Sequence, residues 1–475
     1  MSATIALSLI SHTNAGKTTL ARTLLGRDVG EVRDAAHVTE AATSYPLLDT
    51  VEGDHLVLWD TPGFGDSARL ARRLAQQGSP IGWLLSQVWD RYRDRAFYLS
   101  QQAVRNVQEC SDVVLYLVNA SEAPGDAGYL GPELDVLGWI DKPVIVLLNQ
   151  TGRPRPRAAE AADEARWREA VGRRPFIRAV VTLDAFARCW VQEIALLELI
   201  APALPEDKRD AFQRINAAWR QRRWTQFDES MTALATAIAD AACDREPVPE
   251  TGVKSTLREV GRVLGLTRGQ GADAKSIAAK ALATRLDSAF RASAEQLIAI
   301  HQLEGSAAQE VMARLAEGTT LDAPVNEFKA AMMGGVASGA LTGLAADIAA
   351  GGLTLGAGTL TGAVLGALGG AGIARGINLA RGKSGASLRW DDSILNGLVN
   401  ASLLRYLAVA HYGRGRGGYA QTEYPAFWQP LVTEALAARA DALAALWKRR
   451  ESVSESVSDT AAIAAELKNL LADAA

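Results

Sequence analysis

The sequence predicts an α/β domain with a mostly parallel, doubly wound sheet, followed by a mainly helical region. In the first 200 residues, short apolar runs alternate with helical segments, and this alternation favours parallel strands joined by crossover helices. After residue 204 the apolar residues recur with the period of a helix to the end of the chain. We therefore divide the chain into a first domain, 1–203, and a helical domain, 204–475.

Composition excludes several classes of protein. The chain has 475 residues, a net charge of -4, 48% hydrophobic and 22% charged residues, which are values of an ordinary soluble protein. They exclude a disordered chain, a fibrous repeat and a polytopic transporter, and they make nucleic acid an unexpected partner. The three cysteines lack the spacing of a zinc site or a disulfide framework.

The predicted strands of the first domain are apolar runs that end in polar residues. They cover residues 3–11, 45–50, 55–60, 113–119, 144–149 and 176–183. The first strand leads into H-T-N-A-G-K-T-T-L, where a helix begins at G-K-T. A strand, a loop of small residues and a helix in this order are the context of a phosphate-binding loop.

This loop predicts a site for a nucleoside triphosphate. Backbone N–H groups and the helix N-terminus would surround the phosphates, with Lys17 at the β/γ oxygens and Thr18 at Mg²⁺. Lys17 is also the single lysine in the first 141 residues. The residues that we expect to bind nucleotide here are Ser11, Asn14, Ala15, Gly16, Lys17, Thr18 and Thr19. Ser11 stands where the full pattern has glycine.

A second element of the site follows the strand at 55–60. This strand ends in Asp60, and D-T-P-G places Gly63 three residues later. Asp60 would hold Mg²⁺ through water, and the Gly63 amide would sense the γ-phosphate at the start of a switch loop.

The base-recognition motif departs from the usual N-K-x-D. The strand at 144–149 ends in Asn149, followed by Gln150 in the lysine position and Gly152 in the aspartate position. Loss of the charged acceptor for guanine would cost discrimination of about 2–4 kcal/mol. GTP and GDP are the expected ligands, and ATP stays open. The turn at 183–185 occupies the place of the last base-contacting loop.

N-A-G-K-T followed by D-T-P-G resembles the Era-like and tRNA-modification branch of P-loop GTPases. S-H-T-N-A-G-K-T-T-L with L-N-Q-T-G is similar to a bacterial GTP-binding family that carries a C-terminal domain of unknown function. The resemblance implies switch I at 28–43, with Thr39 as a Mg²⁺ ligand and Thr43 as the alternative. It also implies that Asn14 helps to bind potassium in place of an arginine finger, which makes Lys17, Asn14 and Thr39 the catalytic candidates.

The residue after D-T-P-G is Phe64, where Ras-like enzymes have a water-positioning glutamine. An apolar side chain cannot polarise water, so intrinsic hydrolysis should be slow. The amphipathic stretch at 67–112 is long for one switch II helix. It predicts a protein effector surface or, alternatively, extra helical packing.

The helical domain contains a nearly uncharged stretch at 330–374, where Asp347 is the one charged residue. Glycines recur every fourth residue in both of its arms, and basic residues flank its ends, which favours a hairpin inserted from the cytoplasmic side of the inner membrane. Asp347 near mid-membrane would cost about 2.5–3.5 kcal/mol, so a soluble buried hairpin is the alternative. His301 and His411 are expected to be structural, and R-G-K-S at 381–384 is not expected to be a second phosphate loop.

Together these features predict a Mg²⁺-dependent GTP switch that controls a helical domain associated with a membrane. A scaffold that binds nucleotide and scarcely hydrolyses it is one alternative. An Era-like factor bound to the ribosome or to RNA is the other, with the basic loop at 411–419 as its additional support.

Overall fold

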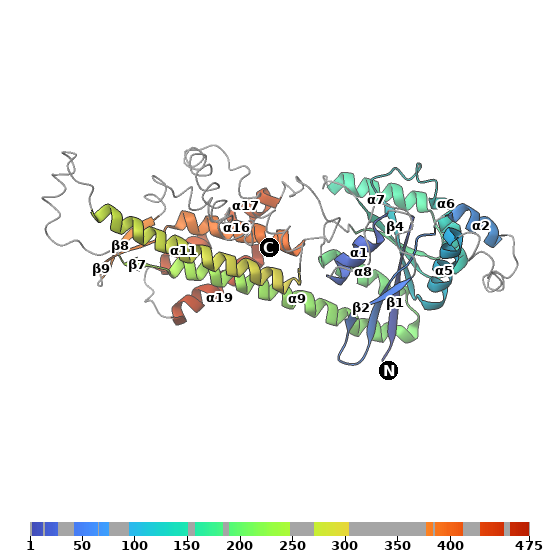
Figure 1. Ribbon diagram of the computed structural model, residues 1–475, viewed down its shortest axis with the longest axis horizontal. Coiled ribbons are helices and arrows are strands. Elements are labelled where there is room, and N and C mark those ends of the chain that lie inside the picture. The colour runs from blue at the N-terminus through green and yellow to red at the C-terminus, as the bar shows by residue number, and fades with distance from the viewer. Residues whose placement is uncertain are drawn as a thin grey trace. The chain divides into compact units, whose positions relative to one another are not determined.

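The computed structural model describes the parts of the chain that are drawn as ribbons in Figure 1. They are residues 2–12, 15–26, 42–64, 66–75, 95–150, 157–183, 190–247, 270–303, 377–382, 385–411, 428–450 and 457–474. These residues fall into two compact units. The first contains those up to Thr225 with Ala410 and His411, and the second contains the rest. The predicted domain division at residues 203 and 204 stays a prediction.

Among the described residues, the first unit has a six-stranded sheet in the order β2-β3-β1-β4-β5-β6. Every neighbouring pair is parallel except β2 and β3. The fold predicted from the sequence, a mostly parallel α/β sheet, is confirmed. The strands are β1 (Thr4–Ser11), β2 (Thr43–Asp49), β3 (His55–Asp60), β4 (Val113–Asn119), β5 (Val144–Asn149) and β6 (Ile177–Thr182).

Helices connect the strands of this sheet. They are α1 (Lys17–Leu25), α2 (Ser67–Ala75), α5 (Arg95–Cys110), α6 (Leu130–Ile140), α7 (Arg157–Val171), α8 (Trp190–Ile200), the short η1 (Ala201–Ala203) and the first part of α9 (Glu206–Cys243). Because side chains alternate across a strand, β4 supplies Val113, Leu115 and Leu117 to one core cluster. Its intervening residues, Val114 and Tyr116 among them, join the other cluster.

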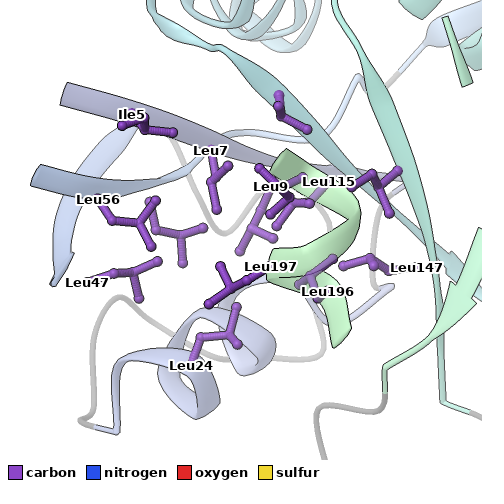
Figure 2. Close-up of a cluster of buried hydrophobic side chains, with 14 of the residues drawn as sticks. Ile5, Leu7, Leu9, Leu24, Leu47, Leu56, Leu115, Leu147, Leu196 and Leu197 are labelled. Carbon is purple, nitrogen blue, oxygen red and sulfur yellow. The ribbon is translucent and has the colours of Figure 1, made fainter. Parts of the chain in front are cut away.

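The first of these clusters packs β1 against α1, α8 and α9. Figure 2 shows Leu7 and Leu9 of β1 beside Leu24 of α1 and Leu197 of α8. Phe212 of α9 is fully buried in the same cluster. Each buried leucine contributes about 1.5–3 kcal/mol, so this face of the sheet holds α1 against the strand that precedes it.

Ion pairs fix α9 to the amino-terminal edge of the sheet. The Lys208 ammonium donates to the Thr4 carbonyl at 3.1 Å and to Asp112 at 2.7 Å. Arg214 donates from Nε to Asp54 at 2.7 Å. Thr4 and Asp112 lie at the start of β1 and just before β4, so this edge is opposite to the one where β1 leads into the phosphate loop.

The second unit combines helices with a small antiparallel sheet of order β7-β9-β8. Its helices are the rest of α9, α11 (Gln270–Ile300), α16 (Asp392–Ala410), α17 (Trp428–Ala437), α18 (Ala440–Arg449) and α19 (Val457–Ala474). Its strands are β7 (Glu246–Pro247), β8 (Ile377–Gly382) and β9 (Gly385–Trp390). The sequence did not predict these strands, although the mainly helical character of the region is confirmed. Arg381 and Gly382 end β8, so no strand-loop-helix arrangement begins there.

Within the described ranges, α16 is long and apolar enough to cross a membrane by length and composition, and half of it (50%) is buried in the unit. It carries Arg405, which is 4% exposed and donates to the Phe290 carbonyl at 3.1 Å. Burial lowers the pKa of Arg405 to about 10. Next to it, Tyr406 contacts the ring of His301, which bonds Ser230 at 3.1 Å. These contacts are those of a core helix, and they give His301 the structural role expected of it. The apolar stretch at 330–374 lies outside the described residues.

Asp54 generates a prediction about stability. Its buried carboxylate accepts from the Ala3 amide at 3.0 Å and from Arg214, and the Arg214 hydrogen bond is the main reason that its pKa is lowered. A lowered folded-state pKa means that this carboxylate stabilises the fold above its unfolded pKa and loses that effect as pH falls through the folded value. Asp54→Asn should therefore lower the thermal midpoint by a few degrees at neutral pH, and the difference should shrink in acid.

Asp49→Asn is the matched control in the same hairpin. Asp49 pairs with His55 at 2.6 Å, but both side chains are at least half exposed, so little stability should be lost. Thermal unfolding followed by circular dichroism between pH 3 and pH 8 measures both variants. Equal losses in the two variants, or an Asp54→Asn loss that grows in acid, would contradict the assignment.

Candidate nucleotide-binding site

The loop between β1 and α1 is shaped by hydrogen bonds within the chain. Ser11, at the end of β1, is fully buried and accepts a hydrogen bond from the Lys17 ammonium at 3.1 Å. Its hydroxyl donates to the His12 carbonyl at 2.5 Å, and the Ala15 amide donates to the same carbonyl at 3.4 Å. Serine is therefore accommodated where the pattern has glycine, because its hydroxyl bonds the loop that it belongs to.

Two features of the loop require glycine at position 16: its backbone conformation and the lack of room for a side chain. Gly16 has a φ of +88°, in the left-handed region, and it caps the N-terminus of α1. A Cβ at this position would lie 2.7 Å from Nδ2 of Asn149. The loop and the end of β5 thus approach too closely for any side chain at this position, and the N-terminus of α1 begins directly after it, where an anion would be favoured.

Asn149 joins the end of β5 to the loop. Its side chain is fully buried, and Nδ2 donates to the Ala15 carbonyl at 2.8 Å. Its own carbonyl accepts from the Ala120 amide at 2.7 Å, which ties in the end of β4. Gln150 has a positive φ of 57°, and its amide lies beside Gly16. Both residues therefore lie beside the phosphate loop, and their predicted role in binding the nucleotide stays a prediction.

Thr18 and Asp60 meet at the carboxyl edge of the sheet. The β1–β3 register pairs Leu9 with Asp60, and the Thr18 hydroxyl donates to Oδ2 of Asp60 at 2.9 Å. Asp60 is 2% exposed, and its second oxygen, Oδ1, is buried without a hydrogen-bond partner. Burying an ionised oxygen without a hydrogen bond costs free energy, unless a cation or a water molecule binds to it.

The buried charges near the loop act on each other. Burial lowers the pKa of Lys17, while the charges of Asp60 and Glu133 oppose this effect. Burial likewise raises the pKa of Asp60, against the Lys17 charge and the Thr18 hydrogen bond. The two groups therefore stabilise each other's charged forms in a place with little water.

The structure places several other predicted residues. Thr19 is buried in the first turn of α1, and Gly63 lies half-buried after β3. Thr61 is fully buried and donates from its hydroxyl to the Leu9 carbonyl, which fixes D-T-P-G against β1. Phe64 is fully buried in the hydrophobic core, where it cannot position a water molecule.

Some predicted residues lie outside the described part of the chain. They are Asn14, Thr39, Gly152 and the turn beyond Leu183. Thr43, the alternative to Thr39, begins β2 and pairs in register with Asp60. Among the described residues, no group of three or more His, Cys, Asp and Glu side chains could hold a metal ion. A metal here would need Thr18, Asp60 and oxygens from the nucleotide.

Sequence reasoning missed one cluster beside the loop. His12 bonds Glu133 of α6 through Nδ1 at 2.8 Å, and Tyr116 donates to the other Glu133 oxygen at 2.8 Å. The His12 ring stacks on Tyr129 at 4.2 Å. The available signal was a glutamate in the mainly apolar segment L-G-P-E-L-D-V-L-G, where an exposed position would have been the ordinary interpretation.

The parallel sheet, the phosphate loop, the Thr18–Asp60 contact and Asn149 against the loop define a P-loop GTPase domain. The comparisons agree, since residues 7–150 match the family model described as 50S ribosome-binding GTPase. Residues 168–472 match the model described as domain of unknown function (DUF3482), which is more than half of the chain. The chain belongs to this DUF3482 family. No curated protein matches the sequence.

Solved structures that resemble the chain include two of Era and one of a probable GTP-binding protein engB. Era in complex with MgGDPNP and part of 16S ribosomal RNA is 19% identical, with a TM-score of 0.32 over 43% of this chain and 58% of that chain. A variant of Era from Aquifex aeolicus bound to GDP and AlF4- is 20% identical, with a TM-score of 0.31 over 43% and 57%. The engB structure is 16% identical, with a TM-score of 0.26 over 41% and 98%. The chain thus spans less than two thirds of either Era chain.

Gly16→Ala should abolish tight guanine-nucleotide binding, because the new Cβ would push Asn149 away from the loop and strain a positive φ. We expect GDP affinity to fall at least about tenfold, the equivalent of one lost buried hydrogen bond. Titration with a fluorescent GDP analogue measures this affinity. Gly131→Ala is the control, since no atom lies within 4 Å of a Cβ there. Equal affinities of the two variants would contradict the assignment of the loop.

Proposed function

We propose that the GTPase domain is a Mg²⁺-dependent switch that binds GTP, hydrolyses it slowly and controls the helical region. The observation behind this proposal is the Thr18–Asp60 hydrogen bond at 2.9 Å beside the unpartnered Oδ1 of Asp60. A threonine hydroxyl, one carboxylate and phosphate oxygens are the donors that Mg²⁺ prefers in nucleotide sites.

The residues present fit this ion. Thr18 would bind Mg²⁺ directly and Asp60 through water, with Thr39 as the proposed third residue from switch I. When bound, Mg²⁺ neutralises charge on the β- and γ-phosphate oxygens. The chain's own residues do the rest of the binding. Lys17 would supply a positive charge, backbone N–H groups at the start of α1 would donate to the phosphate, and Gly16 would give it close access to the backbone.

Slow hydrolysis follows from Phe64, because a fully buried phenyl ring cannot orient the attacking water. Asn14 with potassium is our proposed substitute for an arginine finger. A scaffold that binds nucleotide with almost no turnover is the alternative, and it has the same supporting observation. Multiple-turnover phosphate release in potassium against sodium distinguishes the two functions.

An effector surface beside switch II has a local feature in its favour. Side chains of α2 and α6 line a cavity of about 480 Å³, with Leu74 on one helix and Pro132 and Trp139 on the other. Since α2 follows D-T-P-G directly, a protein seated there would respond to the bound nucleotide.

We propose that the second output is at the inner membrane, through the stretch at 330–374. The support is its sequence, with Asp347 as the one charge among glycine-rich apolar residues. Switch loops ordered by γ-phosphate would then bias whether this segment is exposed. A factor for the ribosome or RNA is the second candidate, favoured by the name of the family model and by the Era complex with RNA. The net charge of -4 speaks against it.

The metal site can be tested by nucleotide affinity with and without Mg²⁺. Lys17→Ala should lose nucleotide binding while the protein still folds. Thr18→Val and Asp60→Asn should reduce the gain in GTP-analogue affinity that Mg²⁺ provides by roughly ten- to a hundredfold. Thr23→Val, a buried threonine one turn further along α1, is the control and should behave as the wild type. A full Mg²⁺ effect in Asp60→Asn would exclude the proposed site.

The membrane proposal is tested by flotation of the full chain with liposomes of anionic lipid. We compare GDP, a non-hydrolysable GTP analogue and an ATP analogue, and we expect flotation to depend on the guanine nucleotide. Deletion of 330–374 should abolish it. Leu365→Arg, which keeps the segment, should weaken it because a mid-membrane charge costs about 2.5–3.5 kcal/mol. Flotation that ignores both the nucleotide and these changes would sink the proposal.

A further inference from the structure

Glu133 is a buried carboxylate that the nucleotide-binding motifs do not account for. It lies in the first turn of α6, is 0% exposed, and uses both oxygens in hydrogen bonds with His12 and Tyr116. Removing a carboxylate from water costs on the order of several kcal/mol unless its hydrogen bonds offset that cost. One of those bonds reaches the phosphate loop, on the residue directly after β1.

We propose that Glu133 is a positioning residue for nucleotide binding, which holds the phosphate loop in its binding conformation through His12. This inference rests on the proposed function, because it assumes that the loop binds the phosphates. It concerns Glu133, which lies outside the motifs that carry the family resemblance.

Two contacts fix the His12 ring, and a third fixes its partner Glu133. Its Nδ1 donates to Glu133 Oε1 at 2.8 Å, since an ionised carboxylate can only accept, and this sets the tautomer of the ring. The Tyr129 ring stacks on it with an interplanar angle of 9°. Burial, together with the Glu133 charge, raises the pKa of Tyr116 well above its usual range, so Tyr116 remains a donor to Glu133. The His12 side chain is therefore held by β4 and α6 together.

The main chain of His12 is held as well. Its carbonyl accepts from Ser11 and from the Ala15 amide, and Ser11 also accepts from Lys17. Anchoring the ring to α6 thus restricts the backbone on both sides of the loop before any ligand arrives. A loop ordered in advance loses less conformational entropy on binding, and this difference appears as affinity.

Replacement of Glu133 would therefore remove the hydrogen bond that anchors the His12 ring to α6. A role limited to folding would predict lower stability with unchanged nucleotide affinity, and this difference decides the test.

The experiment is a double-mutant cycle on the full chain, read as the affinity and dissociation rate of a fluorescent GDP analogue. His12→Leu and Glu133→Leu should each weaken binding about tenfold, the loss expected for a hydrogen bond to a charged group. The double variant should bind no more weakly than the worse single one, because both changes remove the same bond.

Conservative variants test the hydrogen bond itself. The amide nitrogen of His12→Asn lies as many bonds from the backbone as Nδ1, so this variant should bind within about threefold of the wild type, the ordinary spread of independent surface effects. If Glu133→Leu does not fold, two other comparisons decide whether Glu133 supports nucleotide binding. They are the affinity of Glu133→Gln against the wild type, and the affinity of His12→Asn against that of His12→Leu.

Two results would overturn the inference. In one, His12→Leu binds as tightly as the wild type or as His12→Asn. In the other, the two single effects multiply in the double variant. Lys17→Ala separates this failure from that of the proposed function. If Lys17→Ala still binds nucleotide, the assignment of the nucleotide site is wrong. If Lys17→Ala loses binding but His12→Leu binds normally, only the proposed role of Glu133 is wrong.

Discussion

The balance between the half-buried Lys17 ammonium and the buried carboxylates of Asp60 and Glu133 is the constraint on which the nucleotide site depends. Desolvation disfavours the charged form of Lys17, and the negative charges of Asp60 on β3 and Glu133 on α6 favour it. Neither carboxylate would be tolerated alone at such low exposure. The carboxyl edge of the sheet is therefore arranged so that the positive charge stays available for phosphate, with hydrogen bonds on the remaining oxygens except for Oδ1 of Asp60.

The parallel sheet is what brings these charges together. Parallel strands end at the same edge, so the residues after β1, β3, β4 and β5 meet there although they are far apart in sequence. Asn149 shows the geometric side of this arrangement, because its amide bonds the Ala15 carbonyl and leaves room for nothing larger than Gly16. Electrostatics and close packing thus specify the same loop conformation from two sides.

Much of this arrangement could be predicted from the sequence. All six strands of the large sheet lie within two residues of their predicted bounds, because buried parallel strands are continuous apolar runs. The Thr18–Asp60 contact follows from motif spacing. Glu133 could not be predicted, since one acidic residue in a helix is ordinarily exposed and only the tertiary fold pairs it with His12. Strands β8 and β9 were missed because I-N-L-A-R-G-K-S-G-A-S-L-R-W has a single β-branched residue, Ile377, and Leu388 and Trp390 of β9 are buried only in the tertiary fold.

Within the first unit, α9 is anchored at two places along the sheet. Lys208 and Arg214 bond Asp112 and Asp54 at the amino-terminal edge of the sheet, away from the phosphate loop. Further along, Arg223 and Glu193 form a buried ion pair at 2.7 Å between α9 and α8, and α8 packs its leucines on β1. The start of α9 is therefore held by charges at one edge, whereas its contact through α8 reaches the packed face of the strand that leads into the phosphate loop.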